Sequence, residues 1–351
     1  MRLSIGTLCI LAALLFASKA DAQVSVGLVA PLTGPSAILG QQMRTGASLA
    51  AEKLALRLTV ADDGCTAEGG ARAARELVSA GVQIVIGFLC GEAIEAALPI
   101  LKQASIATIT VGVRTDSLTD RKNRTGWLVY RLGPRSDSER EAAGRLLARL
   151  WQKELFAIVD DGTIYGRELS ESLRAASEQA GLSPVFVDTF RPQLDNQIGL
   201  VGRLRQAGAT HVFAAGERDD IAIIGRDAAQ LQAGLVVAGG EALRAPGEIP
   251  LAAGTLMVAL PEWPDLVLPE VAKAFADRRL LDQGYVLPAY ASVEIAQAAL
   301  AAGGLPAANL SGRDFATAIG TIRFDDEGDL TENPYRLFRY DGANFSKVAV
   351  P

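Results

Sequence analysis

The feature that most limits how this chain can fold is a regular alternation of short apolar runs with longer helical stretches. We expect strands at Val24–Ala30, Leu56–Ala61, Gln83–Phe88 and Ile106–Val111, and helices at Ala37–Lys53, Ala67–Ala80 and Ala93–Gln103. Strands that alternate with helices predict βαβ units and a parallel sheet. The nearly continuous apolar character of these strands agrees, because the strands of a parallel sheet are covered on both faces.

The alternation stops at Leu128–Leu132 and Gly133–Ser138, and then a second series begins. Its expected helices are Glu139–Gln152, Tyr165–Ala180, Ile198–Gln206 and Asp219–Gln232, and its expected strands are Leu155–Asp160, Val185–Phe190, His211–Ala215, Leu235–Ala238 and Thr255–Leu260. A second α/β series predicts a second parallel sheet.

Another break, Pro261-Glu262-Trp263-Pro264, precedes a mainly helical stretch. Helices are expected at Leu268–Leu281, Pro288–Ala302 and Arg313–Ile319, and short strands at Thr321–Phe324 and Tyr335–Tyr340. The simplest α/β fold returns these late helices to the first sheet, giving two Rossmann-like lobes joined by a three-strand hinge. Lobe 1 would then hold residues 23–133 and 262–328, and lobe 2 residues 134–261 and 329–351. Two tandem domains would show much the same pattern.

The first 22 residues have the three parts of a secretory signal peptide. A basic start at Arg2 precedes an apolar stretch, Ile5–Ala17, and an A-x-A ending at Ala20–Ala22. The apolar stretch is shorter than the roughly 20 residues that a membrane span needs. Cleavage after Ala22 is therefore expected, with a buried N-terminal helix as the alternative. Cys9 lies inside the apolar stretch, so no lipid anchor at the new N-terminus is expected.

Charge and cysteine content narrow the class of protein further. The formal net charge is −6 and aromatic residues make up 6% of the chain, which argues against a nucleic-acid partner because phosphates require a basic face. Removal of residues 1–22 would leave two cysteines, Cys65 and Cys90, and in an oxidising compartment such a pair predicts one disulfide. Two separately buried thiols are the alternative.

No set of residues for catalysis is visible in the sequence. It contains no G-x-x-x-x-G-K-[ST] phosphate loop, no G-x-G-x-x-G after the first strand and no G-x-S-x-G elbow. The single histidine, His211, falls in an expected strand, where a structural role is the usual one. The paired acids Asp62-Asp63, Asp160-Asp161 and Asp219-Asp220 stand where acids commonly cap helices. We therefore expect a binding protein with no enzymatic activity, cofactor or metal site.

A ligand site is expected where the parallel strands end. Ligands of open α/β sheets bind at the carboxyl ends of the strands, close to helix N-termini that favour an anionic group. The corresponding segments, which are rich in glycine, are Leu32–Gly40, Leu89–Ala93, Thr110–Thr115, Asp161–Gly166, Gly216–Asp219 and Gly239–Leu243.

Several of these segments resemble the type I periplasmic binding proteins for branched-chain amino acids. The resemblance covers Pro31–Pro35 with Gly40, the Asp62–Cys65 and Gly87–Cys90 pair, Asp160–Gly166, and Phe324–Asp329. It implies a monomeric periplasmic receptor of an ABC importer. Its two lobes would close on an amino acid or small carboxylate, and permease subunits would be its partners.

Carried onto this chain, the resemblance implies a ligand site at these positions: Ile38, Gly91, Glu92, Val113, Arg114, Tyr165, Glu217 and Glu241. Glu241 fits the acidic position that helps to take an ammonium group, and Tyr165 fits the accompanying tyrosine. A helix cap or a solvated loop acid is the alternative for Glu241.

The chain also departs from the family pattern. Ile38 stands where some relatives carry a Trp wall, Gly91 where many carry a Ser, and Val113-Arg114 where Ala-Thr is frequent. Arg114 would either clamp a carboxylate or point to solvent. Glu217-Arg218 replaces an aromatic pair, and these two residues would pair with each other or add polarity to the site.

Two other functions remain open at this point. The first is an exported sensor of the same fold that docks on a membrane signalling protein. The second is an exported hydrolase, which the missing catalytic residues disfavour.

Overall fold

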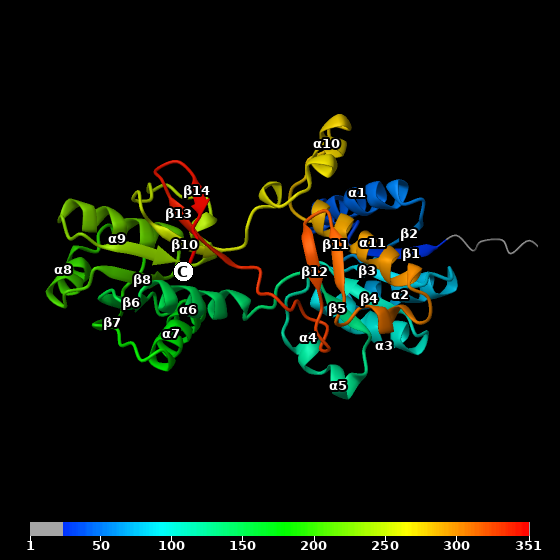
Figure 1. Cartoon of the computed structure of the whole chain (residues 1–351), viewed down its shortest axis with the longest axis horizontal. Helices are drawn as coiled ribbons and strands as arrows, with labels where there is room; N and C mark the ends of the chain where they lie inside the picture. Colours follow the sequence, from blue (N-terminus) through cyan, green and yellow to red (C-terminus); the bar gives the residue numbers. More distant parts are fainter. Residues whose placement is uncertain (1–23, 351) are drawn as a thin grey trace, which may run out of the picture.

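A computed structural model of the chain describes residues 24–350, so the proposed signal peptide and cleavage site lie outside the described residues. Two α/β lobes lie side by side along the long axis of the molecule (Figure 1). No helix within residues 24–350 is both long and apolar enough to cross a membrane.

The first lobe is built on a five-stranded sheet in the order β2-β1-β3-β4-β5. All neighbouring strands in it are parallel. Its strands are β1 (Ser25–Ala30), β2 (Arg57–Asp62), β3 (Ile84–Gly87), β4 (Ala107–Thr110) and β5 (Val129–Arg131). The stretch at which the alternation stops thus supplies an edge strand, β5. The parallel sheet predicted for this half of the chain is confirmed.

Helices cover both faces of this sheet. The helices that precede β5 in the chain are α1 (Ala37–Lys53), α2 (Ala67–Ser79), α3 (Gly91–Gln103), α4 (Ser117–Asp120) and α5 (Lys122–Thr125). The late helices are α10 (Pro269–Asp277), α11 (Val286–Ala301) and the 3-10 turn η3 (Pro306–Asn309). One apolar core combines β1, α1 and α11, through Leu28, Met43 and Tyr290, and a second core lies on the α2–α3 side.

The second lobe has a seven-stranded sheet in the order β14-β13-β10-β9-β8-β6-β7. The strands are β6 (Phe156–Asp160), β7 (Phe186–Thr189), β8 (His211–Ala215), β9 (Val236–Gly239), β10 (Leu256–Ala259), β13 (Arg336–Tyr340) and β14 (Phe345–Lys347). The strands β7, β6, β8, β9 and β10 are parallel to one another, whereas β13 pairs antiparallel with β10, and β14 antiparallel with β13. Its helical elements are α6 (Ser138–Leu150), α7 (Ile164–Gln179), α8 (Ile198–Gln206), α9 (Arg218–Gln230) and the 3-10 turn η1 (Glu241–Arg244). A second 3-10 turn, η2 (Trp263–Asp265), follows β10, and Trp263 packs against the core of the first lobe.

The chain passes between the lobes three times: between β5 and α6, between β10 and α10, and between β12 and β13 (Figure 1). The late helix α11 packs on α1 of the first lobe, as the simplest arrangement predicted, and tandem domains are thereby excluded. A Cβ atom on Gly46 of α1 would lie 1.8 Å from the carbonyl oxygen of Val286 in α11. Glycine at this position is therefore what lets the two backbones approach. The lobe boundaries at residues 133, 261 and 328 stay predictions.

One predicted element is wrong. Residues 313–319 form no helix; they contain β11 (Asp314–Thr317), which pairs antiparallel with β12 (Gly320–Arg323). Along β11 the side chains alternate between exposed and buried, with Phe315 and Thr317 buried. A period of two is typical of a strand with one buried face. A segment of four residues is too short for its sequence to distinguish this period from that of a helix.

The disulfide prediction is confirmed, because Cys65 and Cys90 are bonded, with their Cα atoms 5.3 Å apart. The bond ties the loop after β2 to the residue that precedes α3. It therefore fixes two neighbouring loops at the carboxyl edge of the first sheet.

Candidate functional site

The carboxyl edge of the second sheet is shaped by short loops that the local sequence specifies. After β6, Asp161 Oδ1 accepts hydrogen bonds from the backbone N–H and the hydroxyl of Thr163, at 2.9 and 2.6 Å. Thr163 Oγ1 in turn accepts from the N–H of Gly166 at 3.0 Å and caps α7. The cap fixes the first turn of α7 and with it the position of Tyr165.

The capping role predicted for the paired acids is wrong for the first two pairs, and Asp219 and Asp220 lie in the first turn of α9 but accept from N–H groups outside that helix. Thr66 caps α2 and Thr163 caps α7, each through its hydroxyl. The acids Asp63 and Asp161 accept hydrogen bonds from N–H groups two residues further on, which makes them turn-forming residues.

Five polar residues meet where the two lobes join, and we call them the inter-lobe cluster: Arg114, Glu139, Tyr165, Glu241 and Tyr335. Glu139 Oε1 accepts from the Tyr165 hydroxyl at 2.7 Å and from the backbone N–H of Glu241 at 2.6 Å. Tyr335 donates its hydroxyl proton to Glu241 Oε2 at 2.9 Å. Arg114 Nη1 donates to the Tyr335 hydroxyl at 3.3 Å and lies 3.8 Å from Glu241 Oε2.

These residues come from distant parts of the chain. Arg114 follows β4 of the first lobe, whereas Glu139 lies in α6, Tyr165 in α7, Glu241 in η1, and Tyr335 just before β13. The Arg114 carbonyl accepts from the N–H of Ser136, in the first crossing between the lobes, at 2.8 Å. The cluster therefore lies beside the hinge and contains groups from both lobes.

Gly240 allows these groups to come together. A Cβ atom at this position would lie 2.4 Å from Glu139 Oε1 and 2.7 Å from the Tyr165 hydroxyl. A larger residue would displace the Glu139 carboxylate and the Tyr165 hydroxyl from these positions.

Burial dominates the electrostatics of the cluster. It raises the pKa of Glu139, and it also raises the pKa values of Tyr165 and Tyr335, so both phenols keep their protons as donors. Nearby carboxylates add to the effect on the tyrosines. The Tyr335 ring is buried in the apolar core on the α6–α7 side. Two carboxylates and one guanidinium thus share a half-buried site that offers two hydroxyl donors.

The sequence predicted three members of this cluster, Arg114, Tyr165 and Glu241, and the structure brings them together. Arg114 does not point freely to solvent, since it contacts both Tyr335 and Glu241. Glu139 and Tyr335 were missed. The one local signal for them is that each follows turn-forming residues: Glu139 follows Gly133–Ser138, and Tyr335 follows Pro334.

The other predicted site residues lie outside this cluster. Ile38 is 71% exposed in the first turn of α1, and Glu92 is exposed in the first turn of α3. Gly91 opens α3, and a Cβ atom there would lie 3.6 Å from Thr115 Oγ1, next to Arg114. The Val113 side chain is buried in the core on the α2–α3 side.

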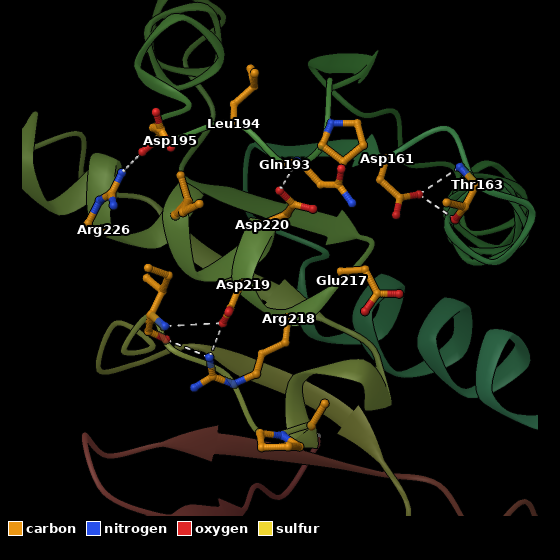
Figure 2. Close-up of a pocket in the computed structure, with 15 residues that line it drawn as sticks. Asp161, Thr163, Gln193, Leu194, Asp195, Glu217, Arg218, Asp219, Asp220 and Arg226 are labelled. Atoms are coloured by element: carbon orange, nitrogen blue, oxygen red, sulfur yellow. Dashed lines mark hydrogen bonds and ion pairs between the residues drawn. The ribbon is translucent and has the colours of Figure 1, made fainter.

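Glu217 lines a separate cavity of about 700 Å³ within the second lobe. Figure 2 shows Asp161, Glu217 and Asp220 around it, with Arg226 at its far side. Glu217 does not pair with Arg218, because Arg218 Nη1 bonds Asp219 Oδ1 at 2.6 Å. This cavity adds an acidic surface beside the carboxyl ends of β6 and β8.

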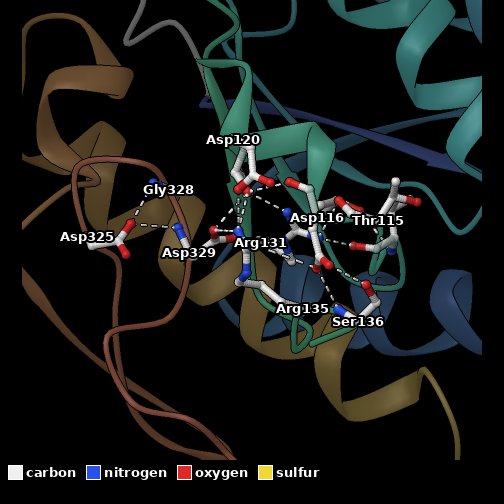
Figure 3. A network of polar contacts seen from close by, with 12 residues as sticks. Thr115, Asp116, Asp120, Arg131, Arg135, Ser136, Asp325, Gly328 and Asp329 are labelled. Carbon is white, nitrogen blue, oxygen red and sulfur yellow. Dashed lines mark hydrogen bonds and ion pairs between the residues drawn. The ribbon is translucent and has the colours of Figure 1, made fainter. Parts of the chain in front are cut away.

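A second polar network holds the hinge to the first lobe (Figure 3). The fully buried Arg131 donates from Nε to Asp329 Oδ1 at 2.7 Å and from Nη2 to Thr119 Oγ1 at 2.6 Å. Arg135 donates to the other oxygen of Asp329 at 2.9 Å and also pairs with Asp120 at 2.9 Å. The first and third crossings are thereby tied together at the base of the first lobe.

The described residues contain no group of three or more His, Cys, Asp or Glu side chains placed to hold a metal ion. The fold and the cluster define a two-lobed α/β binding protein whose polar groups converge at the hinge.

Comparison with known proteins gives the family. A model of the periplasmic binding protein family matches residues 23–348, and the chain belongs to that family. It is similar to the Leu/Ile/Val-binding protein BraC3 of Rhizobium johnstonii, at 26% identity over 97% of this chain and 98% of the relative.

Solved structures agree on the fold. One is described as a putative branched-chain amino acid ABC transporter from Rhodospirillum rubrum, with a TM-score of 0.76 at 18% identity over 93% of this chain and 100% of the other. A second is a solute binding protein of an ABC transporter from Rhodopseudomonas palustris in complex with 3,4-dihydroxy benzoic acid. Its TM-score is 0.59 at 17% identity, covering 94% of this chain and 99% of the other. The names of these similar proteins thus include both aliphatic amino acids and an aromatic acid as ligands.

Proposed function

We propose that this protein is an exported receptor that binds an amino acid or a related small carboxylate between its lobes. It would deliver that ligand to the permease subunits of an ABC importer. The name of the Rhizobium relative supports an aliphatic amino acid as the ligand. The observation that carries the proposal is the inter-lobe cluster, which places carboxylates of the second lobe opposite a guanidinium of the first.

The cluster offers a partner to each end of an amino acid. Glu241 and Glu139 suit an ammonium group, since a charge buried on binding needs an opposite charge and hydrogen bonds. Arg114 and the N–H groups at the start of α3, at Gly91 and Glu92, suit a carboxylate. Closure of the lobes about the three crossings would bring the two sets together.

Calorimetric titration with leucine, isoleucine, valine and small aromatic acids tests the proposal. The substitution Glu241→Gln keeps the shape of the side chain and removes its charge, so we expect an amino acid to bind about 10- to 100-fold more weakly. This corresponds to about 1.5–3 kcal/mol for a charge-assisted hydrogen bond. Glu168→Gln on α7 is the matched control, because Glu168 pairs with Arg140 at the surface and lies outside the cluster.

Glu139→Gln should weaken binding as well, because Glu139 holds both Tyr165 and the backbone of Glu241 in place. A full panel of amino acids, amides and aromatic acids without any measurable heat or thermal shift would refute the receptor proposal.

Export is part of the same proposal. The mature protein from the periplasm should begin at Gln23, which N-terminal sequencing of the purified protein measures. A chain that retains Met1 in the periplasmic fraction would contradict the cleavage.

A further inference from the structure

The inter-lobe cluster already contains a cation of its own. Arg114 Nη1 lies 3.8 Å from Glu241 Oε2, and the Tyr335 hydroxyl bridges the two by accepting from Arg114 and donating to that same oxygen. Arg114 belongs to the first lobe and its partners to the second. Its guanidinium thus stands at the carboxylate oxygen where a ligand ammonium group would bind.

The carboxylates need such a cation. Glu139 Oε1 accepts from the backbone N–H of Glu241, which brings the Glu139 carboxylate of α6 to the turn η1 that carries the second acid. Like charges at this separation repel each other when they are withdrawn from water. Within residues 24–350, Arg114 is the one basic residue that forms an ion pair with either of them.

The contact is built so that it can be exchanged. Direct ion pairs have N–O distances of about 2.7–2.9 Å, and at 3.8 Å the Arg114–Glu241 pair is longer. Its side chains are 44% and 26% exposed, so water competes for both. By contrast, the Arg131–Asp329 pair at the hinge is buried and 2.7 Å long. The Arg114 pair can therefore open without disturbing the hinge.

We propose that Arg114 is an internal substitute for the ammonium group of the ligand, and that binding is an exchange of ion pairs. The ligand amine replaces Arg114 at Glu241, and the released guanidinium binds the ligand carboxylate. A molecule with both groups gains two ion pairs for the one it breaks, whereas a simple amine gains one and leaves Arg114 without an ion-pair partner. Arg114 thus selects against simple amines. This inference rests on the proposed function, because it concerns the same site.

Isopentylamine, which is leucine without its carboxylate, tests the exchange. Its affinity and that of leucine are measured by calorimetry on the wild type, Arg114→Gln, Arg114→Lys and a control, Arg121→Gln. Arg121 is a matched control because it also pairs with a glutamate of the first lobe, Glu95, and has similar exposure, 35% against 44%.

We expect Arg114→Gln to bind isopentylamine at least 10-fold more tightly than the wild type does, and leucine at least 10-fold more weakly. Arg114→Lys should still exclude the amine because it keeps the charge, and Arg121→Gln should behave as the wild type. If Arg114→Gln binds isopentylamine no better than the wild type, the exchange is refuted, whatever leucine does. If no amino acid binds the wild type, the receptor function fails instead, and the amine comparison still tests Arg114.

Discussion

Replacing Asp329 with asparagine removes the counter-charge of a guanidinium that has no access to water. Arg131 is fully buried, and its Nε lies 2.7 Å from Asp329 Oδ1. The other oxygen, Oδ2, accepts from Thr119 at 2.8 Å and from Arg135 at 2.9 Å. Asparagine has nearly the same shape but no charge, and its NH2 group cannot accept, so the donors at one of the two oxygen positions lose their acceptor.

The expected cost is large because the charge left behind stays buried. Removal of one partner of a buried ion pair typically costs about 3–5 kcal/mol. The control is Asp120→Asn, since Asp120 bonds Arg135 at the same 2.9 Å but is 54% exposed. An exposed pair is worth about 0–1 kcal/mol.

Urea unfolding measures this difference. If the slope is about 3 kcal/mol per molar urea, a loss of 3–5 kcal/mol lowers the midpoint by about 1–1.7 M. Asp120→Asn should lower it by less than about 0.3 M on the same slope. Because two lobes can unfold in separate steps, tryptophan fluorescence and circular dichroism are recorded together. Trp127 reports on the first lobe and Trp151 on the second.

A midpoint for Asp329→Asn that matches that of Asp120→Asn would refute the reasoning, because it would mean that the charge of the buried pair contributes no more than an exposed one. The double variant Arg131→Met/Asp329→Leu provides a further check. It removes both charges, so it should be more stable than Asp329→Asn alone.

The remaining predictions concern covalent and backbone constraints. The Cys65–Cys90 bond closes a loop with a sequence separation of 25 residues, so changing both cysteines to serine should cost roughly 3 kcal/mol, read from the urea midpoint; an unchanged midpoint would contradict this estimate. Gly46→Ala should cost about 1–3 kcal/mol, because its Cβ would lie 1.8 Å from the Val286 carbonyl oxygen. Gly202→Ala in α8, with open space around it, should be neutral or stabilising by about 1 kcal/mol; equal effects of the two glycine changes would refute the packing argument.

Much of the fold was predictable because its signals are local. The predicted helix Ala37–Lys53 has the same bounds as α1, and the predicted strand Leu155–Asp160 differs from β6 by one residue. In both, periodicity and flanking turn residues act within a single element. The predicted strand Thr321–Phe324 overlaps β12, whereas β11 was missed because it is short and its buried face is covered by residues that the local sequence does not reveal.

The candidate site was predictable only in part. Tyr165 and Glu241 follow strands of a parallel sheet, and the carboxyl ends of such strands meet at one edge. Glu139 lies 102 residues from Glu241, and Tyr335 lies 221 residues from Arg114. Contacts between residues so far apart in the sequence depend on how the chain crosses between the lobes, so no local pattern reveals them.

By itself, the sequence determined that this chain forms two α/β series with charged residues at the strand ends, and it predicted the Cys65–Cys90 disulfide with two separately buried thiols as the alternative. The tertiary structure alone decided that Arg114 faces Glu241, that Glu139 links Glu241 to Tyr165, and that Arg131 is sealed against Asp329. The physical reason is that secondary structure follows from neighbours along the chain, whereas an ion pair requires two charges to be brought together in space and taken partly out of water.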